Sequence, residues 1–159
     1  MKTKLIATAA SLALALPAFA LDGPEEPVRA IYGAQGVPDT AAEADRWLAR
    51  DLAAAYKRDL AAGEPRPSTD FDWRYGSQEY EISDLVFMRG EHVTPPGELP
   101  TRVEAAVSFR SFNQGPYTVT WTLCLGESGW RVADVHSNDT GGGWRLREML
   151  ELPSDQVQC

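Results

Sequence analysis

Residues Arg102–His136, RVEAAVSFRSFNQGPYTVTWTLCLGESGWRVADVH, decide the fold of this chain. Alternating apolar and polar residues are typical of half-buried β-strands, and the stretch contains three such runs, at 102–112, 116–125 and 130–136. The intervening segments NQG and GESG are short and contain glycine, as hairpin turns do. The stretch therefore predicts a three-stranded antiparallel meander.

One face of this meander is predicted to be apolar, because successive side chains of a strand point to opposite faces. The apolar face carries Val103, Ala105, Val107, Phe109, Tyr117, Val119, Trp121, Leu123 and Leu125. In the third strand the same rule groups Trp130, Val132, Asp134 and His136, which places a carboxylate and an imidazole on the core face. The other face carries Glu104, Ser108, Thr118, Thr120 and Thr122. So polar a face fits a monomer.

Helices and one further strand precede the meander. Thr40 and Glu43 have the spacing of a capping box and predict a helix from Ala41 to about Ala62. Shorter helical segments are expected at 27–36 and 144–150. Residues 80–88 predict a strand, with one face formed by Tyr80, Ile82, Asp84, Val86 and Met88. The chain is therefore expected to be α+β, with N-terminal helices packed on a curved antiparallel sheet of about four strands.

Three aromatic residues, Phe71, Trp73 and Tyr75, lie in the loop at 66–78. Aromatic side chains contribute mostly burial energy, which favours a loop that folds back onto the core. The alternative is that they line the mouth of a pocket.

The first twenty residues have the pattern of a secretory signal peptide. Lys2 and Lys4 precede an apolar stretch at 5–16, and Ala18-Phe19-Ala20 is a small-x-small cleavage sequence. A short membrane anchor is the alternative, but the apolar stretch is short for a membrane span. We expect cleavage after Ala20 and a periplasmic or secreted protein that is not membrane-bound once the signal is removed. The mature chain is expected to form one domain over 21–159, with its core at about 27–152.

The chain is acidic, with a formal charge of −8 that becomes −10 when Lys2 and Lys4 leave with the signal. Such a charge argues against binding nucleic acid or anionic lipid through bulk electrostatics. It is compatible with a basic protein partner or a cationic ligand, although acidity is also a common means of staying soluble.

Two cysteines, Cys124 and Cys159, are an even number in a chain expected to be exported. Oxidising compartments favour disulfides, so we expect these two to pair and to pin the C-terminal tail to the middle strand. The alternative is that both thiols stay free.

Several short motifs resemble the nuclear transport factor 2-like superfamily, which has a cystatin-like cone fold, and are similar in particular to an exported bacterial domain family within it. The motifs are Phe71-Asp72, Gly76-x-Gln78, Ile82-x-Asp84-Leu85, Val103–Phe112, Gly129-Trp130-Arg131-Val132-x-Asp134-Val135 and Trp144-x-Leu146-Arg147. The resemblance covers 27–152 and implies a sheet that wraps around helices and encloses a cone-shaped cavity. Members include steroid isomerases, dehydratases and epoxide hydrolases, as well as binding and dimerisation modules. Members often dimerise through the outer face of the sheet, so the resemblance makes a homodimer the alternative to a monomer.

Asp84 and Asp134 are the candidate catalytic residues, because each stands among apolar same-face neighbours. A desolvated carboxylate facing a cavity would serve as a general base. The candidate pocket comprises Tyr32, Tyr56, Asp84, Trp121, Asp134 and His136. The alternative role is structural, with each carboxylate bonding backbone N–H groups or pairing with Arg110, Arg131 or Arg147.

No metal site or cofactor is expected, because no histidine, cysteine or carboxylate cluster has ligand spacing and no nucleotide fingerprint occurs. The resemblance implies an exported, non-catalytic binding or interaction module of unknown ligand, with a small-molecule cavity in the cone. One alternative is an inhibitor or immunity-type protein for a basic partner. The other is a cofactor-free isomerase, dehydratase or hydrolase that uses a pocket aspartate.

Overall fold

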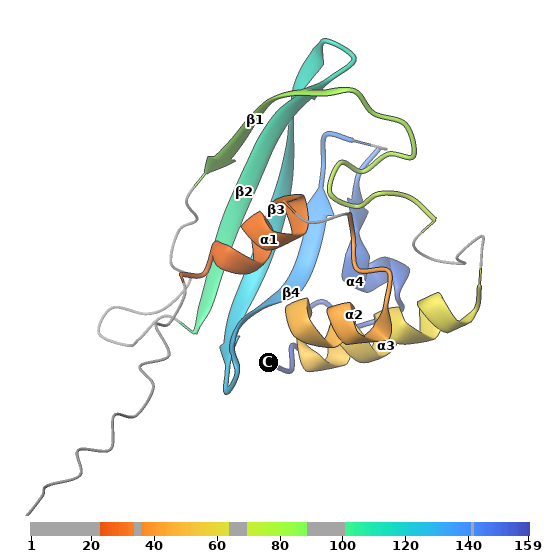
Figure 1. Ribbon diagram of the computed structural model, residues 1–159, viewed down its shortest axis with the longest axis vertical. Coiled ribbons are helices and arrows are strands. Elements are labelled where there is room, and N and C mark those ends of the chain that lie inside the picture. Colours follow the sequence, from red (N-terminus) through yellow and green to blue (C-terminus); the bar gives the residue numbers. More distant parts are fainter. Residues whose placement is uncertain (1–22, 34–35, 64–69, 89–100, 141) are drawn as a thin grey trace, which may run out of the picture.

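The computed structural model describes residues 23–33, 36–63, 70–88, 101–140 and 142–159 (Figure 1). The predicted signal peptide and its cleavage site lie outside these residues. The elements in chain order are α1 Glu26–Gly33, α2 Ala41–Trp47, α3 Arg50–Ala61, β1 Ile82–Met88, β2 Arg102–Ser111, β3 Gln114–Gly126, β4 Gly129–Ser137, β5 Trp144–Arg145 and α4 Leu146–Met149. The α+β class predicted from the sequence is confirmed.

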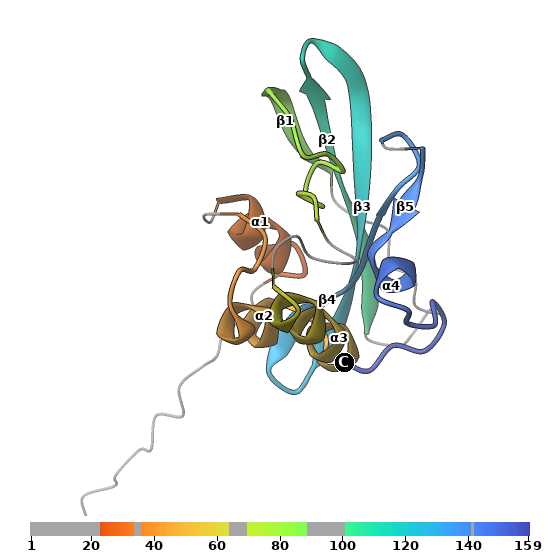
Figure 2. The same ribbon diagram turned by 90° about the vertical axis from the view of Figure 1, so that its right-hand side faces the viewer.

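The strands form one antiparallel sheet in the order β1-β2-β3-β4-β5, so the predicted meander is confirmed as β2, β3 and β4. Helices α1, α2 and α3 lie together on one side of this sheet (Figure 2), and α4 lies beside β4 and β5. The sheet has one strand more than expected. The segment predicted as a helix at 144–150 opens with β5, whose residues pair with His136 and Ser137, before α4 begins at Leu146.

A core rich in aromatic side chains fills the space between the sheet and the three N-terminal helices. The largest fully buried side chains include Trp73, Trp121, Tyr56 and Phe109. The ring centres of Trp73 and Trp121 lie 5.4 Å apart, and those of Tyr56 and Trp73 lie 6.2 Å apart. Because Trp73 comes from the loop before β1, the expectation that this loop folds back onto the core is confirmed.

The long helix expected at 41–62 is instead two helices, separated by Leu48 and Ala49 in extended conformation. Leu48 forms a parallel bridge with Val132 of β4, and the Ala49 N–H donates to the Val132 carbonyl at 2.7 Å. A continuous helix would keep this N–H within its own ladder, whereas the break uses it to bind the edge of the sheet. The predicted N-terminus is correct, since Thr40 Oγ1 accepts from Glu43 N at 3.2 Å.

A β-bulge in β1 makes the predicted face of this strand wrong. The register against β2 shifts between Ser83 and Val86, so Phe87 pairs with Val107 and packs against the core. Val86 and Met88 are consequently exposed. An extra residue reverses the in-and-out alternation beyond it, which simple counting by two does not reveal.

A second bulge, in β4, has the same effect on Asp134 and His136. Opposite the bulge, Leu123 pairs with Val132 and Thr122 pairs with Asp134, so the register skips Ala133. Val132 and Val135 therefore both reach the core, whereas Asp134 and His136 lie on the outer face beside Thr122 and Thr120. The predicted placement of Asp134 and His136 on the core face is thus wrong.

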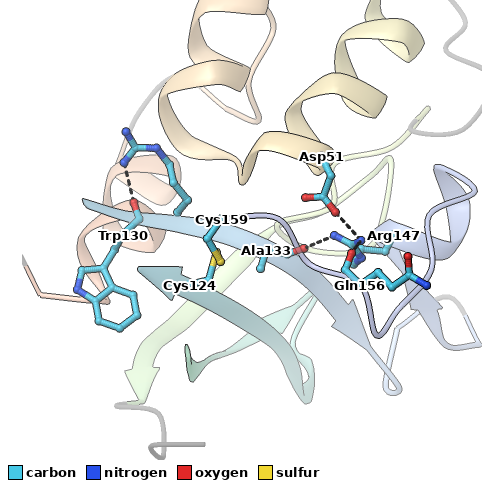
Figure 3. Close-up of a disulfide and its surroundings, with 8 residues drawn as sticks. Asp51, Cys124, Trp130, Ala133, Arg147, Gln156 and Cys159 are labelled. Carbon is cyan, nitrogen blue, oxygen red and sulfur yellow. Dashed lines mark hydrogen bonds and ion pairs between the residues drawn. A yellow bond between two sulfur atoms is a disulfide. The ribbon is translucent and has the colours of Figure 1, made fainter. Parts of the chain in front are cut away.

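The C-terminal tail, residues 151–159, returns from α4 to β3, where Cys159 forms the predicted disulfide with Cys124 (Figure 3). The Cα atoms of the two cysteines are 5.9 Å apart. Arg147 Nε donates to the Pro153 carbonyl at 2.9 Å, and its Nη2 donates to the Gln156 carbonyl at 2.6 Å. The tail is therefore held both by a covalent bond and by a buried guanidinium.

Candidate functional site

Asp84, the first candidate base, lies at the surface. Its side chain is 73% exposed and forms an ion pair with Arg110, whose Nε is 3.5 Å from Asp84 Oδ2. The backbone φ of Asp84 is +53°, so this residue occupies the left-handed region within the bulge of β1. Asp84 therefore shapes the strand rather than facing a desolvated cavity.

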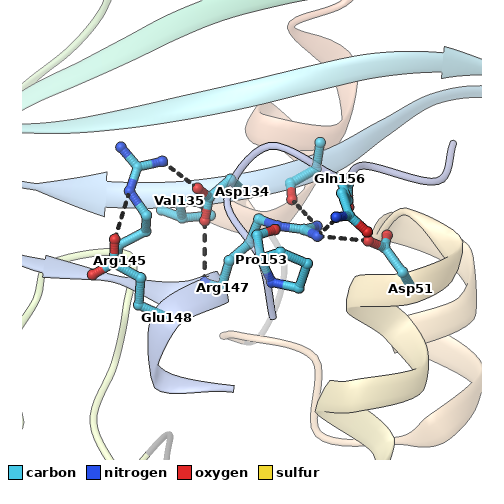
Figure 4. Close-up of polar contacts among 9 residues, drawn as sticks. Asp51, Asp134, Val135, Arg145, Arg147, Glu148, Pro153 and Gln156 are labelled. Atoms are coloured by element: carbon cyan, nitrogen blue, oxygen red, sulfur yellow. Dashed lines mark hydrogen bonds and ion pairs between the residues drawn. The ribbon is translucent and has the colours of Figure 1, made fainter. Parts of the chain in front are cut away.

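Asp134, the second candidate base, is buried but fully engaged in structural bonds (Figure 4). Its Oδ1 accepts the backbone N–H groups of Val135 and Arg147 at 2.9 and 3.2 Å. Its Oδ2 accepts Nη1 of Arg145, which also lies 3.7 Å, through Nε, from Glu148. The carboxylate thus anchors the first turn of α4 to β4. It lies on the outer face of the sheet and not on the face that packs against the core.

His136 lies next to this ion pair on the outer face of the sheet. Among the described residues, its buried Nδ1 has no hydrogen-bond partner. Burial lowers the pKa of His136, and the neighbouring Arg145 guanidinium lowers it further, against the opposing pull of Asp134 and Glu104. This imidazole is therefore held neutral at the edge of a structural cluster.

Tyr32, Tyr56 and Trp121 do lie in the interior, yet they pack against other rings and backbone. Tyr32 donates its hydroxyl to the Arg74 carbonyl at 2.6 Å, and Tyr56 donates to the Pro38 carbonyl at 3.0 Å. Burial raises the pKa of Tyr32 far above its ordinary range. These hydroxyls tie the N-terminal helices to the loops that cover the core.

The six candidate pocket residues line none of three hollows formed by the described residues, at 31–47, beside the disulfide and at the β2–β3 hairpin. The structure brings Tyr32 and Trp121 together, with ring centres 5.6 Å apart, and Asp134 and His136 together on the opposite face. It leaves Asp84 apart from both groups. The residues predicted to form one pocket therefore lie in three separate places in the fold.

A hollow of about 460 Å³ lies at the β2–β3 hairpin. Figure 1 shows this hairpin at the end of the sheet away from α2 and α3. We call it the aromatic groove. Four of its lining residues are the aromatic side chains Tyr75, Phe109, Phe112 and Tyr117. The remaining ones are Gly76, Ser77, Glu79, Ser111, Gln114, Asp139 and Thr140. Three segments far apart in the sequence thus meet there: the loop before β1, the β2–β3 hairpin and the loop after β4.

Rings of graded exposure form the wall of this groove. Phe109 is fully buried, Tyr75 is 8% exposed, and Phe112 at the hairpin turn is 53% exposed. The ring centres of Tyr75 and Phe109 lie 5.3 Å apart, and those of Phe109 and Tyr117 lie 6.0 Å apart. Tyr75, Phe109 and Tyr117 therefore form a connected aromatic wall, and Phe112 lines the same hollow from the exposed hairpin turn.

Asp72 fixes the loop that presents Tyr75. Its Oδ1 accepts the Arg74 backbone N–H at 3.0 Å, and its Oδ2 accepts Nη2 of Arg74 at 2.6 Å and the Tyr80 hydroxyl at 2.8 Å. A carboxylate that bonds the backbone two residues onward is the standard way to hold such a turn. The Tyr80 ring packs against Tyr75 at a tilt of 45°, with ring centres 4.4 Å apart.

Gly76 allows this loop to approach the loop after β4. Its φ is +66°, and a Cβ at this position would overlap Thr140 Oγ1 and Trp144 Nε1. The Trp144 Nε1 donates to Thr140 Oγ1 at 3.0 Å directly beneath it. Only glycine has both the backbone freedom and the lack of a side chain that this position requires.

Charge distinguishes the aromatic groove from the larger hollow, of about 610 Å³, beside the disulfide. The charged residues of the aromatic groove are Glu79 and Asp139. The larger hollow is lined by Arg50, Lys57 and Arg131, with Asp45 and Glu127 also present. Lys57 is already paired with Asp45 at 2.6 Å. The aromatic groove is thus anionic, whereas the larger hollow has charges of both signs.

Sequence reasoning reached only part of this groove. Tyr75 belongs to the loop whose aromatics offered a pocket mouth as the alternative to burial, and it meets both descriptions. Phe112 and Tyr117 flank the first hairpin turn, and an unusually apolar residue in a turn was the available signal. Glu79 and Asp139 could not be connected to them without the sheet register.

The described residues contain neither a metal-binding cluster nor a membrane-spanning helix. They contain no group of three histidine, cysteine or acidic side chains able to hold a metal ion. Among them, too, no helix is long and apolar enough to cross a membrane. Comparison with known proteins found no matching family model, curated protein or solved structure.

Proposed function

We propose that this chain is an exported, non-catalytic binding module of the nuclear transport factor 2-like superfamily, and that the aromatic groove is its ligand site. The observation that carries the proposal is the wall of four aromatic side chains beside two carboxylates in a hollow of about 460 Å³. Ligand sites for small molecules have this size and this mixture of apolar wall and few polar groups. A large exposed ring such as Phe112 at a turn has no role in the core and fits a ligand contact.

The bonds of the two candidate bases support binding rather than catalysis. Asp84 is solvated beside Arg110, and Asp134 is neutralised by Arg145 and two backbone N–H groups. A general base needs a free lone pair directed at a substrate, and neither carboxylate lines any of the three hollows formed by the described residues. The signal-like N-terminus and the disulfide support the proposed periplasmic or secreted location.

Nuclear magnetic resonance of the oxidised, ¹⁵N-labelled protein, titrated with a library of small soluble molecules, tests the proposal. We expect at least one compound class to shift the amides of Tyr75, Phe109, Phe112 and Tyr117 in a saturable manner. The Phe112→Ala variant should lose this response. Val86→Ala is the matched control, because Val86 is equally exposed, at 53%, but lies on β1 away from the groove. A library that leaves the groove amides unshifted in the folded protein would refute the assignment.

A further inference from the structure

Charge complementarity limits what the aromatic groove can hold. Its charged lining residues, Glu79 and Asp139, are both acidic, and none of its lining residues is lysine, arginine or histidine. The whole chain adds to the same field, with a formal charge of −8. An anionic ligand would meet repulsion without a compensating cation, whereas a cation would be attracted.

Both carboxylates are held on firm backbone at the rim. Asp139 Oδ2 accepts the Thr118 backbone N–H at 3.0 Å, and no described residue bonds Oδ1. The backbone of Glu79 is fixed by Ser77, whose Oγ donates to the Glu79 carbonyl at 2.7 Å and accepts its N–H at 3.2 Å. Asp139 therefore offers an oxygen on a side chain that is already held in place, whereas the Glu79 carboxylate, which no described residue bonds, has to be ordered by the ligand.

The aromatic wall supplies the second attraction for a cation. Ring faces carry negative electrostatic potential and attract ammonium and guanidinium groups. This chain already uses the contact: the Arg74 guanidinium lies 5.1 Å from the ring centre of Tyr75. Arg74 adds no net positive charge to the groove, because Asp72 pairs with it at 2.6 Å and Arg74 is not among the lining residues.

From these observations we infer that the aromatic groove binds a free small organic cation, an alkylammonium whose apolar or aromatic body lies against Phe109, Phe112 and Tyr117. The ammonium group would lie between Glu79, Asp139 and the ring faces. This inference rests on the proposed function, since it names the ligand class of the same groove. The volume of about 460 Å³ suits a free molecule rather than a folded partner.

Three soluble compounds with one aromatic body and different charge test the inference: 2-phenylethylammonium, 2-phenylethanol and 3-phenylpropanoate. At pH 7 and low salt we expect the ammonium to bind about tenfold more tightly than the alcohol, and the carboxylate to bind more weakly than both. The affinities come from saturation of the groove amide shifts. Raising the salt concentration should reduce the preference for the ammonium over the alcohol, because the carboxylates of Glu79 and Asp139 lie at the exposed rim of the groove.

Conservative variants isolate the charge. Glu79→Gln and Asp139→Asn should each reduce the preference for ammonium over alcohol by severalfold, while the affinity for the alcohol stays unchanged. Asp139→Asn keeps an oxygen that accepts the Thr118 N–H. Glu127→Gln is the matched control, because it removes an acidic charge from the other hollow and should leave the preference intact.

The outcomes separate the two proposals. Equal binding of alcohol and ammonium, lost in Phe112→Ala, would overturn the cation inference and leave the ligand groove standing. Tightest binding of the carboxylate, or a preference that survives both conservative variants, would also overturn it. Binding of lysine-rich peptides without binding of the free ammonium would contradict the free-molecule class. If none of the three compounds binds, the cation inference fails, and the library titration then decides whether the groove itself is a ligand site.

Discussion

Arg147 Nη2 lies 2.7 Å from Asp51 Oδ2, and this buried ion pair joins α3 to α4 across 96 positions of the chain. The guanidinium is completely buried and also donates to the carbonyls of Ala133, Pro153 and Gln156. One side chain therefore connects a helix, a strand and the C-terminal tail. Its bonds leave no room for a role in ligand binding, so we assign it to stability.

Replacing this guanidinium should destabilise the protein strongly. We expect Arg147→Met to lower the free energy of unfolding by about 3–5 kcal/mol, because it leaves a buried carboxylate and three carbonyls without their donor. Urea unfolding followed by circular dichroism measures the change. Arg58→Met, on the exposed side of α3, is the control and should shift stability by less than about 0.5 kcal/mol. A loss below about 1 kcal/mol for Arg147→Met would contradict the role.

Replacing the two aspartates that the sequence singled out should destabilise the protein to very different extents. Asp84→Asn removes an exposed ion pair and should cost less than about 1 kcal/mol, since asparagine tolerates the positive φ. Asp134→Ala leaves Arg145 and two backbone N–H groups without their acceptor and should cost about 2–4 kcal/mol. The midpoints of urea unfolding compare them directly, and equal midpoints would be inconsistent with the assigned environments.

The Cys124–Cys159 disulfide should contribute about as much to the free energy of unfolding as the bonds of Asp134. It links residues 35 positions apart, for which the chain-entropy estimate is about 4 kcal/mol. We expect the Cys124→Ala/Cys159→Ser double variant to unfold at a correspondingly lower urea concentration. The single variants, kept in reducing agent, should match the double variant. Stability that does not change on reduction of the wild-type protein would show that the bond adds nothing.

Gly76→Ala should disturb the aromatic groove. The added Cβ overlaps Thr140 and Trp144, and the positive φ disfavours alanine, so we expect a loss of about 2–3 kcal/mol. Binding at the groove should weaken with it, because the same loop presents Tyr75. Gly33→Ala is the control: open space surrounds its Cβ position at the end of α1, so stability should stay equal or rise by up to about 1 kcal/mol. Intact binding in Gly76→Ala would contradict the role of this loop.

Stability should fall in mild acid partly through His136. Its pKa is lowered in the folded state from the ordinary value of 6.5 by burial and by Arg145, so the unfolded chain binds the proton more readily. The stability it contributes is therefore full above pH 6.5 and is lost as the pH falls through the lower folded pKa. His136→Gln should flatten this part of the pH profile of unfolding. The pKa itself can be measured by titrating the imidazole protons, and a value above 6.5 would reverse the predicted sign.

The sequence predicted most of the fold because its signals are local. Alternation of side chains defined β2 and β3 to within a few residues, and the capping box at Thr40 located the start of α2 correctly. The cysteine pair followed from number and compartment. These signals depend on neighbours a few residues apart, which a sequence displays directly.

The errors all arise where tertiary contacts override a local pattern. No glycine or proline marks the break at Leu48 and Ala49, because the strand edge at Val132 imposes it. The bulges in β1 and β4 each insert one residue and so transfer Asp84, Asp134 and His136 away from the predicted interior. The aromatic groove could not be foreseen, since Tyr75, Tyr117 and Asp139 meet only after the sheet has formed.

Other segments of the chain cover the outer edge of β4, and this has a consequence for solubility. Ala49 N–H binds the Val132 carbonyl, the Arg147 guanidinium binds the Ala133 carbonyl, and β5 pairs with the last residues of the strand. Three separate segments thus occupy one border of the sheet, and a strand from another molecule finds no free ladder there. The opposite border, β1, has no described strand beyond it, but its bulge and the charged Asp84 interrupt the regular spacing that strand addition needs. Edge-to-edge aggregation of concentrated protein would therefore have to begin at Val86–Met88, beyond the bulge.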